Sequence, residues 1–413
     1  MQPKARRAVL AFAFITVTLD MLAISLIAPV FVPLVQRFLD GDVARTATIV
    51  GLLGTSFALM QFLWSPFFGV LSDRFGRKPI LVISGLAVAL DYCIMALAPN
   101  VTWLFIGRTL SGIASANATA ASAYVADVSP PEKRAAAFGL LGAAFGLGFV
   151  IGPAFGGLLG AIGPRVPFWA AAALSLGNAL FGLLVVPESL AREHRSPFTF
   201  RRANPLGSFR LLRANRTLLN LGALSFGSAL AGVVMPSTWV LYVTYRYGWG
   251  ASAIGLSLAG VGVSSVIAQA IVVRPFVRHF GERIALLAGL AFGTIGLVLC
   301  GAAATGPLFF VGLPFLSLWG LAGAAAQSLM TRAVTPAQQG ELQGTINSIR
   351  GVAALIGPIL FTSTFAFGIA GSRNVPGAAW FAGAVLLLLA LAATPSVKDL
   401  GGEKTTHAVE TVA

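Results

Sequence analysis

The chain has 413 residues, of which 57% are hydrophobic and 10% are charged, and its formal net charge is +14. Soluble globular proteins carry about 25% charged and about 45–50% apolar residues, so this composition excludes a soluble fold and also a disordered one. A basic soluble protein would suggest a nucleic-acid partner. In a chain this apolar, the basic residues are instead expected in loops beside anionic lipid headgroups. We therefore predict a protein of the lipid bilayer that binds no nucleic acid.

Long apolar runs occur along the whole chain. Runs such as 81–98 and 377–394 are continuous rather than alternating, and about 20 apolar residues suffice for one helix to cross a bilayer. Helices also satisfy their own backbone hydrogen bonds in lipid. The sequence predicts an all-α membrane protein with twelve spans, at about residues 8–36, 47–71, 79–98, 101–124, 135–160, 167–186, 217–244, 252–273, 284–303, 306–330, 341–366 and 377–396.

The first predicted span follows a short basic segment. Lys4, Arg6 and Arg7 precede a long apolar run, as in a signal peptide. No small-residue cleavage site interrupts this run, so we expect an uncleaved first span. The two cysteines, Cys93 and Cys300, both lie in apolar runs and form neither a disulfide framework nor a zinc spacing. We therefore predict no metal site in the protein itself.

The longest polar gap separates six predicted spans from six. It covers residues 188–216 and contains seven arginines. We read this gap as a linker between two halves. The predicted parts are an N-terminal six-helix half, a cytoplasmic Arg-rich linker, a C-terminal six-helix half and a cytoplasmic tail, at residues 1–187, 188–216, 217–396 and 397–413.

The two halves resemble one another at a constant offset of 205 residues. The matching pairs are Phe75-Gly76 with Phe280-Gly281, Pro131 with Pro336, Gly139 with Gly344, and Gly152-Pro153 with Gly357-Pro358. Parallel repeats around an axis along the membrane normal are one known plan of transporters. We therefore predict two six-helix pseudo-repeats with a central cavity between them.

The distribution of basic residues predicts the orientation. With the N-terminus inside, the inner loops and tails hold 21 of the 28 Lys and Arg residues, and the outer loops hold five. Basic residues are enriched on the cytoplasmic side. We predict a multi-pass protein of the inner (plasma) membrane with both termini in the cytoplasm.

Two acidic residues fall within predicted spans. Asp20 lies about 12 residues into the first span, which is roughly 18 Å deep at 1.5 Å per residue, and Asp91 lies in the third. A charge near the bilayer centre costs about 2.5–3.5 kcal/mol on insertion scales and normally faces the protein interior. Such carboxyl groups are candidates for reversible protonation, and a permanent Asp–Arg pair is the structural alternative. No histidine lies within a span, so a proton relay would have to use carboxylates.

Two arginines complete the charges within the spans. Arg108 in the fourth span is a fixed charge, which can pair with Asp20 or Asp91 or steer an anionic substrate. Arg350 in the eleventh span can replace a missing partner, contact substrate or serve structure alone. The sequence leaves these alternatives open.

Uncharged polar residues are also spread over the predicted spans. Each can form an interhelical hydrogen bond, but as a set they fit a polar central cavity. They are Gln61, Asn117, Asn178, Gln269, Gln327, Gln343 and Asn347.

Two glycine-containing stretches stand out. Residues 139–160 carry glycines at helical spacing, at positions 142, 146, 152, 156 and 160, with Gly148 and Gly157 beside them. Such glycines let helices approach closely, and Pro153 adds a point where the helix can kink. Residues 69–78 predict a tight, charged inner turn, for which a positive-inside anchor is the simplest explanation.

These motifs resemble those of the major facilitator superfamily. Residues 69–78 match its signature G-x-x-x-D-R-x-G-R-K/R at every defined position, namely Gly69, Asp73, Arg74, Gly76, Arg77 and Lys78. Arg108 with Gly112 is similar to the motif of its fourth span. The fifth span is similar to the motif of its antiporters with 12 or 14 spans, through Gly148, Gly152, Pro153, Gly156 and Gly157.

Within that superfamily the chain looks like the tetracycline/proton antiporters. The similarity includes residues 18–21, 59–61, 107–112, 255–260 and 339–344. The resemblance implies that Asp20 and Asp91 couple protons to substrate, with Arg108 as their charge partner and Gln61 near the drug path. It also implies an inner gate contact between Asp73 and Arg77. That family exchanges a divalent-metal–tetracycline complex for protons.

Three positions depart from the pattern of that family. Its usual span 9 carboxylate is replaced by Gly293, its usual span 8 histidine by Ser264, and Arg350 is an addition. Losing an acid and gaining a base makes the cavity more positive, which bears on the form of the substrate and on the proton count.

The leading hypothesis is a proton-coupled antiporter that exports an amphiphilic drug, with tetracycline as the first candidate, by alternating access. The alternatives are an exporter of another drug or metabolite, a symporter or uniporter, and a receptor or scaffold on the same fold.

We expect no enzyme activity and no cofactor beyond the proton gradient; the substrate would travel as a metal chelate if the resemblance holds. The expected partners are the drug, protons and the bilayer, and we expect the protein to function as a monomer. Candidate cavity residues are Gln61, Asn117, Gln269, Gln327, Asn347 and Arg350.

Overall fold

The structure is a computed structural model, and it describes residues 3–115, 117–129, 134–185, 187–195, 210–213, 216–371 and 374–394. These described residues form helices and connecting turns, with no β-strand among them. The first half contains α1 (Pro3–Leu26), α2 (Ala28–Arg37), α3 (Val43–Phe75), α4 (Arg77–Leu97), α5 (Val101–Ala114), α6 (Asn117–Val128), α7 (Arg134–Ile162) and α8 (Val166–Val185).

The second half begins after a short 3₁₀ helix at Arg192–His194 and a single turn, α9 (Arg210–Arg213). Much of the predicted linker, residues 196–209 and 214–215, lies outside the described residues. The remaining helices are α10 (Arg216–Gly232), α11 (Val234–Tyr247), α12 (Ala251–Ile267), the π-helix η5 (Ala268–Val273), α13 (Arg274–Ala302), α14 (Gly306–Val311), α15 (Leu313–Leu318), α16 (Gly320–Arg332), α17 (Gln339–Ile369) and α18 (Ala378–Ala393), with a 3₁₀ turn at Pro336–Gln338.

Membrane crossings follow from helix length and apolarity. In the described part of the chain, nine helical segments are long and apolar enough to cross a membrane. One of them, Ala251–Ala302, has 52 residues, about 78 Å of helix and more than twice a bilayer's apolar thickness. It therefore makes two passes, and these meet at Gly281, whose φ of +80° interrupts the helix. The shorter apolar helices Val101–Ala114 and Ala378–Ala393 complete the twelve predicted crossings.

Local sequence explains where several helices start and break. Asp42 caps α3 by accepting a hydrogen bond from the backbone N–H of Arg45 at 2.9 Å, and Asn100 caps α5 in the same manner. Such side-chain acceptors satisfy N–H groups that have no partner within the helix. The first crossing is divided at Ile27, just before a segment with two prolines, Pro29 and Pro33. Proline removes a backbone donor and crowds the preceding turn, which accounts for the break.

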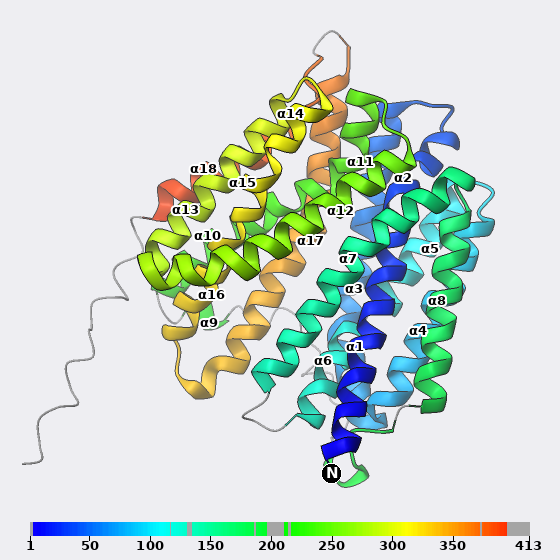
Figure 1. The fold of residues 1–413 in the computed structure, drawn as a ribbon, viewed down its shortest axis with the longest axis vertical. Helices are drawn as coiled ribbons and strands as arrows, with labels where there is room; N and C mark the ends of the chain where they lie inside the picture. The colour runs from blue at the N-terminus through cyan, green and yellow to red at the C-terminus, as the bar shows by residue number, and fades with distance from the viewer. Residues whose placement is uncertain are drawn as a thin grey trace, which may run out of the picture.

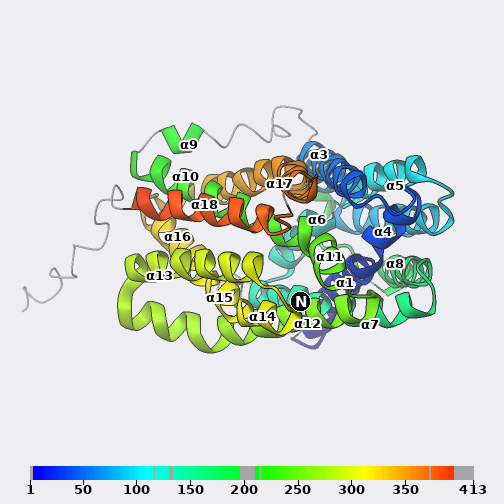
Figure 2. The ribbon, with the colours of Figure 1, turned by 90° about the horizontal axis from the view of Figure 1, so that it is seen from above.

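The two halves lie side by side, and two pairs of helices join them. Figure 2 shows α17 beside α3 on one side of the molecule and α12 beside α7 on the other, and these pairs are the main contacts between halves. Within the first half, α1 packs on α7 and α4 on α8, whereas α13 packs on α16 and α18 in the second.

The contacts between halves are tight at one end of the molecule and open at the other. A Cβ atom added at Gly54 would lie 3.0 Å from Pro358, and one at Gly255 would lie 2.9 Å from Gly157. A Cβ atom at Gly142, which lies nearer the start of α7, would meet nothing within 4 Å. Figure 1 shows α7 and α12 close together near α2 and diverging toward their other ends. The halves are thus joined at the end that carries α2 and separate toward the end that carries the N-terminus.

Candidate functional site

A cavity of about 190 Å³ lies among the helices of the first half. Three of the predicted functional residues line it: Asp20 from α1, Gln61 from α3 and Arg108 from α5. Most of the remaining wall is apolar or aromatic, and it consists of Val17, Met21, Ile24, Phe57, Val88, Tyr92, Ser111, Ser115, Ala121 and Phe145. The cavity is therefore a hydrophobic chamber with one carboxylate, one guanidinium and one amide in its wall.

Asp20 is half-buried and is held by a neighbouring helix. The side-chain amide of Asn178, on α8, donates a hydrogen bond to Asp20 Oδ1 at 2.8 Å and another to the backbone carbonyl of Thr16 at 3.2 Å. This amide links α8 to α1 and fixes the position of the carboxylate. Asn178, which the sequence suggested only as one polar residue among several, is therefore a direct neighbour of the predicted proton-coupling residue.

Asp91 lies beside the cavity rather than in its wall. Its exposed fraction is 0%, and its Oδ2 accepts a hydrogen bond from Ser111, which does line the cavity. Its Oδ1 has no hydrogen-bond partner among the described residues. Glycine at position 107 leaves space for this oxygen, since a Cβ atom there would lie 2.8 Å from it. A buried carboxylate with an unsatisfied oxygen is costly, and such groups often mark functional positions in membrane spans.

Arg108 is held between aromatic rings. Its guanidinium lies 4.3 Å from the ring centroid of Phe31 and 5.5 Å from that of Phe57. These are cation–π distances, and such contacts are stronger away from water. Its Nε has no hydrogen-bond partner in the described part of the chain, and its charge attracts that of Asp91. Arg108 is therefore a fixed positive charge that lines the cavity and interacts with the buried carboxylate.

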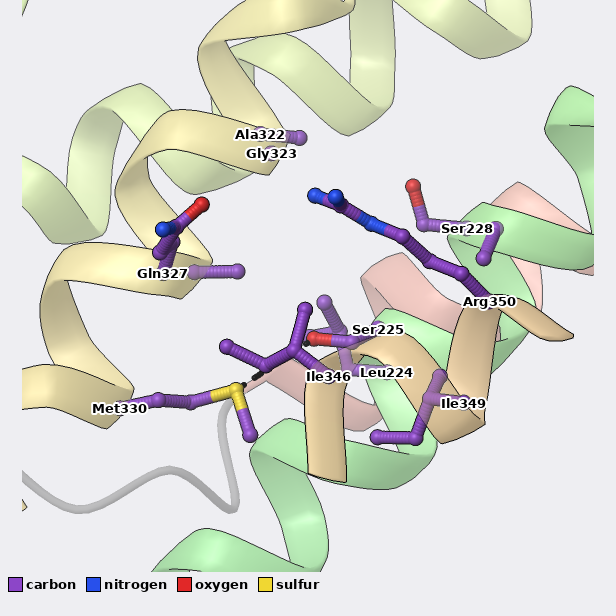
Figure 3. A pocket seen from close by; sticks show the side chains of 12 residues that line it. Leu224, Ser225, Ser228, Ala322, Gly323, Gln327, Met330, Ile346, Ile349 and Arg350 are labelled. Atoms are coloured by element: carbon purple, nitrogen blue, oxygen red, sulfur yellow. Dashed lines mark hydrogen bonds between the residues drawn. The ribbon is translucent and has the colours of Figure 1, made fainter. Parts of the chain in front are cut away.

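A second cavity, of about 150 Å³, lies in the second half among α10, α16 and α17. Arg350 and Gln327 line it together with Ser225, Ser228 and apolar residues that include Leu224, Met330, Ile346 and Ile349. Figure 3 shows the side chains of Arg350 and Gln327 extending toward one another from α17 and α16, with Ser228 near the arginine. The structure thus brings two of the predicted cavity residues together.

The other three predicted cavity residues are placed differently. Gln269, in the π-helix η5, and Asn347, on α17, are exposed and line neither of these two cavities. The backbone of Asn117 begins α6, but its side chain lies outside the part that the structure describes. Their functional roles stay predictions.

The charged turn between α3 and α4 is centred on Arg77, which is 8% exposed. Its guanidinium donates hydrogen bonds to Asp73 at 2.6 Å, to Ser72 at 3.0 Å and to Asp127 at 3.0 Å. Asp127 lies near the end of α6, so this arginine ties the turn to the fourth crossing. Gly76 adopts a φ of +108°, a backbone region that favours glycine. Gly69 lies within α3, and Arg74 lies 5.3 Å from the ring centroid of Phe75.

Two partners of this turn did not stand out in the sequence. Asp127 binds Arg77, and Glu188 accepts hydrogen bonds from the backbone N–H groups of Arg77 at 2.8 Å and Lys78 at 3.3 Å. Glu188 therefore caps the start of α4, where a negative charge is favourable. The only signal for Asp127 was an acidic residue just after the end of a predicted span. Glu188 lies 111 residues from Arg77, and nothing local points to it.

The second half contains a counterpart with inverted charge. Glu282 follows Gly281, another glycine with positive φ, and it forms an ion pair with Arg332 at 2.7 Å. The offset of 205 maps Arg77 onto Glu282 and Asp127 onto Arg332. Both pairs therefore join equivalent turns to equivalent helix ends, but the acid and the base have exchanged places.

The glycine motif of α7 packs against two different helices. A Cβ atom at Gly148 would lie 2.6 Å from Met21 Cβ, and one at Gly152 would lie 2.8 Å from Ser25 Cβ, both on α1. Gly156 is similarly close to the end of α1, and Gly157 faces α12 of the other half. The hydroxyl of Ser25 also donates a hydrogen bond to the backbone carbonyl of Gly148 at 2.8 Å.

Close packing was expected for the whole glycine-rich stretch, and this prediction was wrong for its first part. A Cβ atom at Gly139 or Gly142 would meet nothing within 4 Å, and one at Gly146 would have only an ordinary contact with Val266 at 3.6 Å. The reason is that α7 diverges from its neighbours at this end. The helix continues without interruption through Pro153.

Two of the three positions that depart from the tetracycline/proton antiporter pattern, Gly293 and Ser264, are in contact with neighbouring side chains of the second half. A Cβ atom at Gly293 would lie 2.7 Å from Trp319 and 2.9 Å from Leu387, so a longer side chain has no room there. Ser264 accepts a hydrogen bond from the hydroxyl of Ser317 at 2.8 Å. Neither position contributes a titratable group to the second half.

Comparison with known proteins agrees with this architecture. The family model described as Major Facilitator Superfamily matches residues 13–358. The chain is 40% identical over 378 residues to the class C tetracycline resistance protein of Escherichia coli, covering 92% of this chain and 94% of that protein. It is 37% identical over 382 residues to the class G tetracycline resistance protein of Vibrio anguillarum, covering 92% and 95%.

Solved structures with low sequence identity share the fold. The human organic anion transporter MFSD10 (TETRAN) superposes with a TM-score of 0.70 at 23% identity, covering 95% of this chain and 100% of that one. A bacterial homologue of the human lysosomal transporter Spinster, in its inward-facing and unoccupied conformation, superposes with a TM-score of 0.77 at 18% identity, covering 96% and 98%. The chain belongs to the major facilitator superfamily of membrane transporters, among relatives of the tetracycline resistance proteins.

Proposed function

We propose that this protein exports tetracycline, or a closely similar amphiphilic drug, in exchange for protons. The observation that carries the proposal is the first-half cavity, in which Asp20, Gln61 and Arg108 share one apolar chamber and Asp91 lies one hydrogen bond behind it. Relatives with up to 40% identity are named as tetracycline resistance proteins. A mostly apolar lining with a few polar groups is the lining expected for a site that binds an amphiphilic drug.

Protonation would drive the exchange through the two carboxylates. Protons that enter from outside neutralise Asp20 or Asp91, weaken the binding of substrate and favour the inward-facing state. Loss of those protons to the cytoplasm restores the form that binds substrate. Proton and substrate then compete by linkage, because each biases the same two-state equilibrium.

Alternating access would use the contacts that join the halves. The tight pairs, such as Gly54 with Pro358 and Gly255 with Gly157, lie at the end that we assign to the outside. Opening that end requires these contacts to separate and the opposite end to close. The ion pair between Arg77 and Asp127 holds the inner turn of the first half as one unit, so the halves can move as rigid bodies.

The remaining parts of the proposal are the setting and the form of the substrate. We place both termini in the cytoplasm and the protein in the inner membrane, and we expect it to work as a monomer. The proton gradient is the energy source, and no further cofactor is needed. The metal chelate of tetracycline is one candidate form of the substrate, and the metal-free drug is the other.

The test is uptake of labelled tetracycline into everted membrane vesicles that are energised by a pH gradient. We expect uptake that disappears on addition of a protonophore, and the experiment is run once with magnesium and once with EDTA. Vesicles without the protein provide the control. Absence of gradient-dependent uptake under both conditions would contradict tetracycline as the substrate, and gradient-driven movement in the opposite direction would indicate a symporter.

A further inference from the structure

Arg350 is a positive charge deep within the second half. It lies 11 residues after the start of α17 at Gln339, about 16 Å along the helix axis at 1.5 Å per residue. Despite this depth its side chain is exposed, because it extends into the cavity among α10, α16 and α17. A basic residue at such depth normally faces a partner or a water-filled path.

No acidic residue of the second half neutralises this arginine. Residues 217–396 contain only two acids, Glu282 and Glu341. Glu282 forms its ion pair with Arg332, and Glu341 precedes Arg350 by nine residues, about 13 Å along the helix. Among the residues that the structure describes, Arg350 has neither an ion pair nor a hydrogen bond. Its charge is therefore free to interact with a molecule that enters the cavity.

The cavity around Arg350 matches the chemistry of an amphiphilic anion. Leu224, Ile346 and Ile349 provide apolar walls, whereas Gln327 and Ser228 add an amide and a hydroxyl near the guanidinium. A guanidinium presents several N–H donors in a planar fork that suits a carboxylate or an enolate. An apolar body would occupy the walls while its anionic group meets Arg350. A cationic metal chelate would be repelled at the same place.

We propose that the second-half cavity is an anion-binding subsite of the transport path, in which Arg350 binds the negatively charged group of an amphiphilic organic anion. Gln327 and Ser228 provide further hydrogen bonds to the same group. This inference rests on the proposed function, since it assumes that the chain moves amphiphilic molecules, and it specifies their charge. It follows that the metal-free, anionic form of a drug is accepted without a bound cation.

The test compares two ligands of the same shape and different charge. The full-length protein is purified in detergent, and binding of 2-naphthoate and of its neutral isostere 2-naphthamide is measured by titration calorimetry. We expect the wild-type protein to bind naphthoate about tenfold or more tightly than naphthamide, as one charge-assisted hydrogen bond allows. Equal affinities, or no binding of either compound, would overturn the proposal without any variant.

Variants then assign the preference to Arg350. In Arg350→Gln the ratio of the two affinities should fall to about one, whereas Arg350→Lys should keep part of it because the charge remains. Gln327→Leu should lower the ratio less, since it removes one neutral donor. Arg274→Gln is the matched control, because Arg274 is exposed and lines neither cavity. An unchanged ratio in Arg350→Gln would show that the arginine serves only structure.

The calorimetric result is independent of proton coupling. If vesicle uptake of tetracycline fails while the preference for naphthoate persists, the proposed function is wrong and the anion subsite stands. If uptake succeeds while the two naphthalene compounds bind equally, the anion subsite is wrong and the proposed function stands. Folding of each variant is checked by its elution as a single species in size-exclusion chromatography.

Discussion

The two cavities of this protein differ in charge although they occupy a repeated scaffold. The first-half cavity has Asp20 and Arg108 in its wall and Asp91 beside it, whereas the second-half cavity has Arg350 and no carboxylate. The difference suggests that the two halves have different roles in transport. The carboxylates in or beside the two cavities belong to the first half, whereas the charged group in the second-half cavity is the guanidinium of Arg350.

The two halves share features of their backbone, although their charges differ. Glycines with positive φ occur at both Gly76 and Gly281, and proline lies inside the helix at both Pro153 and Pro358. Only glycine adopts such φ values without strain, and interhelical approach depends on the absence of a side chain. Backbone geometry is thus common to both repeats, whereas the charged residues at equivalent positions differ.

The largest expected effect comes from removing the buried acid. Asp91→Asn should reduce gradient-driven uptake to the level of vesicles without the protein, because asparagine has nearly the same shape but cannot carry a proton on a carboxylate. The measurement is uptake of labelled tetracycline at equal protein levels. Asp42→Asn is the control, since Asp42 only caps α3 and asparagine caps helices equally well. Undiminished uptake in Asp91→Asn would remove this residue from the coupling mechanism.

Equivalent glycines test whether the scaffold is common to both halves. In Gly152→Ala the added methyl group would lie 2.8 Å from Ser25 Cβ, and in Gly357→Ala it would lie 2.6 Å from Val233 Cβ. Each substitution should lower stability by about 1–3 kcal/mol through overpacking, seen as a lower thermal unfolding temperature in detergent. Gly142→Ala on the same helix as Gly152 should have no such effect, because its surroundings are open. If only one of Gly152→Ala and Gly357→Ala lowers the unfolding temperature, the two repeats are not packed equivalently.

The ion pair between Arg77 and Asp127 should contribute more to stability than the pair between Glu282 and Arg332 in the second half. Arg77→Ala leaves Asp127 and Asp73 without their nearly buried partner and should cost about 1.5–3 kcal/mol, as for hydrogen bonds to charged groups. A double-mutant cycle with Asp127→Ala, followed by thermal unfolding, measures the coupling between the two residues. Coupling energy near zero would mean that Arg77 acts through Asp73 or Ser72 instead.

The smallest effect is expected at the inverted pair. Arg332 is 58% exposed in its side chain, and ion pairs in contact with water contribute at most about 1 kcal/mol. Arg332→Gln should therefore change the unfolding temperature little, and added salt should reduce the difference further. A loss as large as that of Arg77→Ala would show that the second-half turn is as important as the first.

The sequence predicted the architecture well because membrane helices leave a strong signal in run length. The twelve crossings, the two repeats and the turn around Arg77 could all be read from apolar runs, spacing and charge. Breaks within crossings, such as the one after Ala114, were not predicted, because neither a proline nor a charged residue marks that point.

The site was only partly predictable. The depth of Asp20, Asp91, Arg108 and Arg350 follows from counting residues, but the side to which each points depends on neighbouring helices. Contacts such as those of Glu188 with the start of α4 join residues more than a hundred positions apart. No local pattern encodes them, and one sequence alone does not reveal such pairs.

The most direct test of the division between the halves separates proton-driven transport from exchange. In Asp20→Asn, tetracycline uptake driven by a pH gradient and exchange of labelled for unlabelled drug without a gradient are measured in the same vesicles. The account predicts that driven uptake is lost while exchange persists at high drug concentration, because asparagine resembles the neutral carboxyl, which weakens drug binding but leaves the substrate path open. Loss of both activities, or survival of both, would contradict the assignment of proton coupling to the first half.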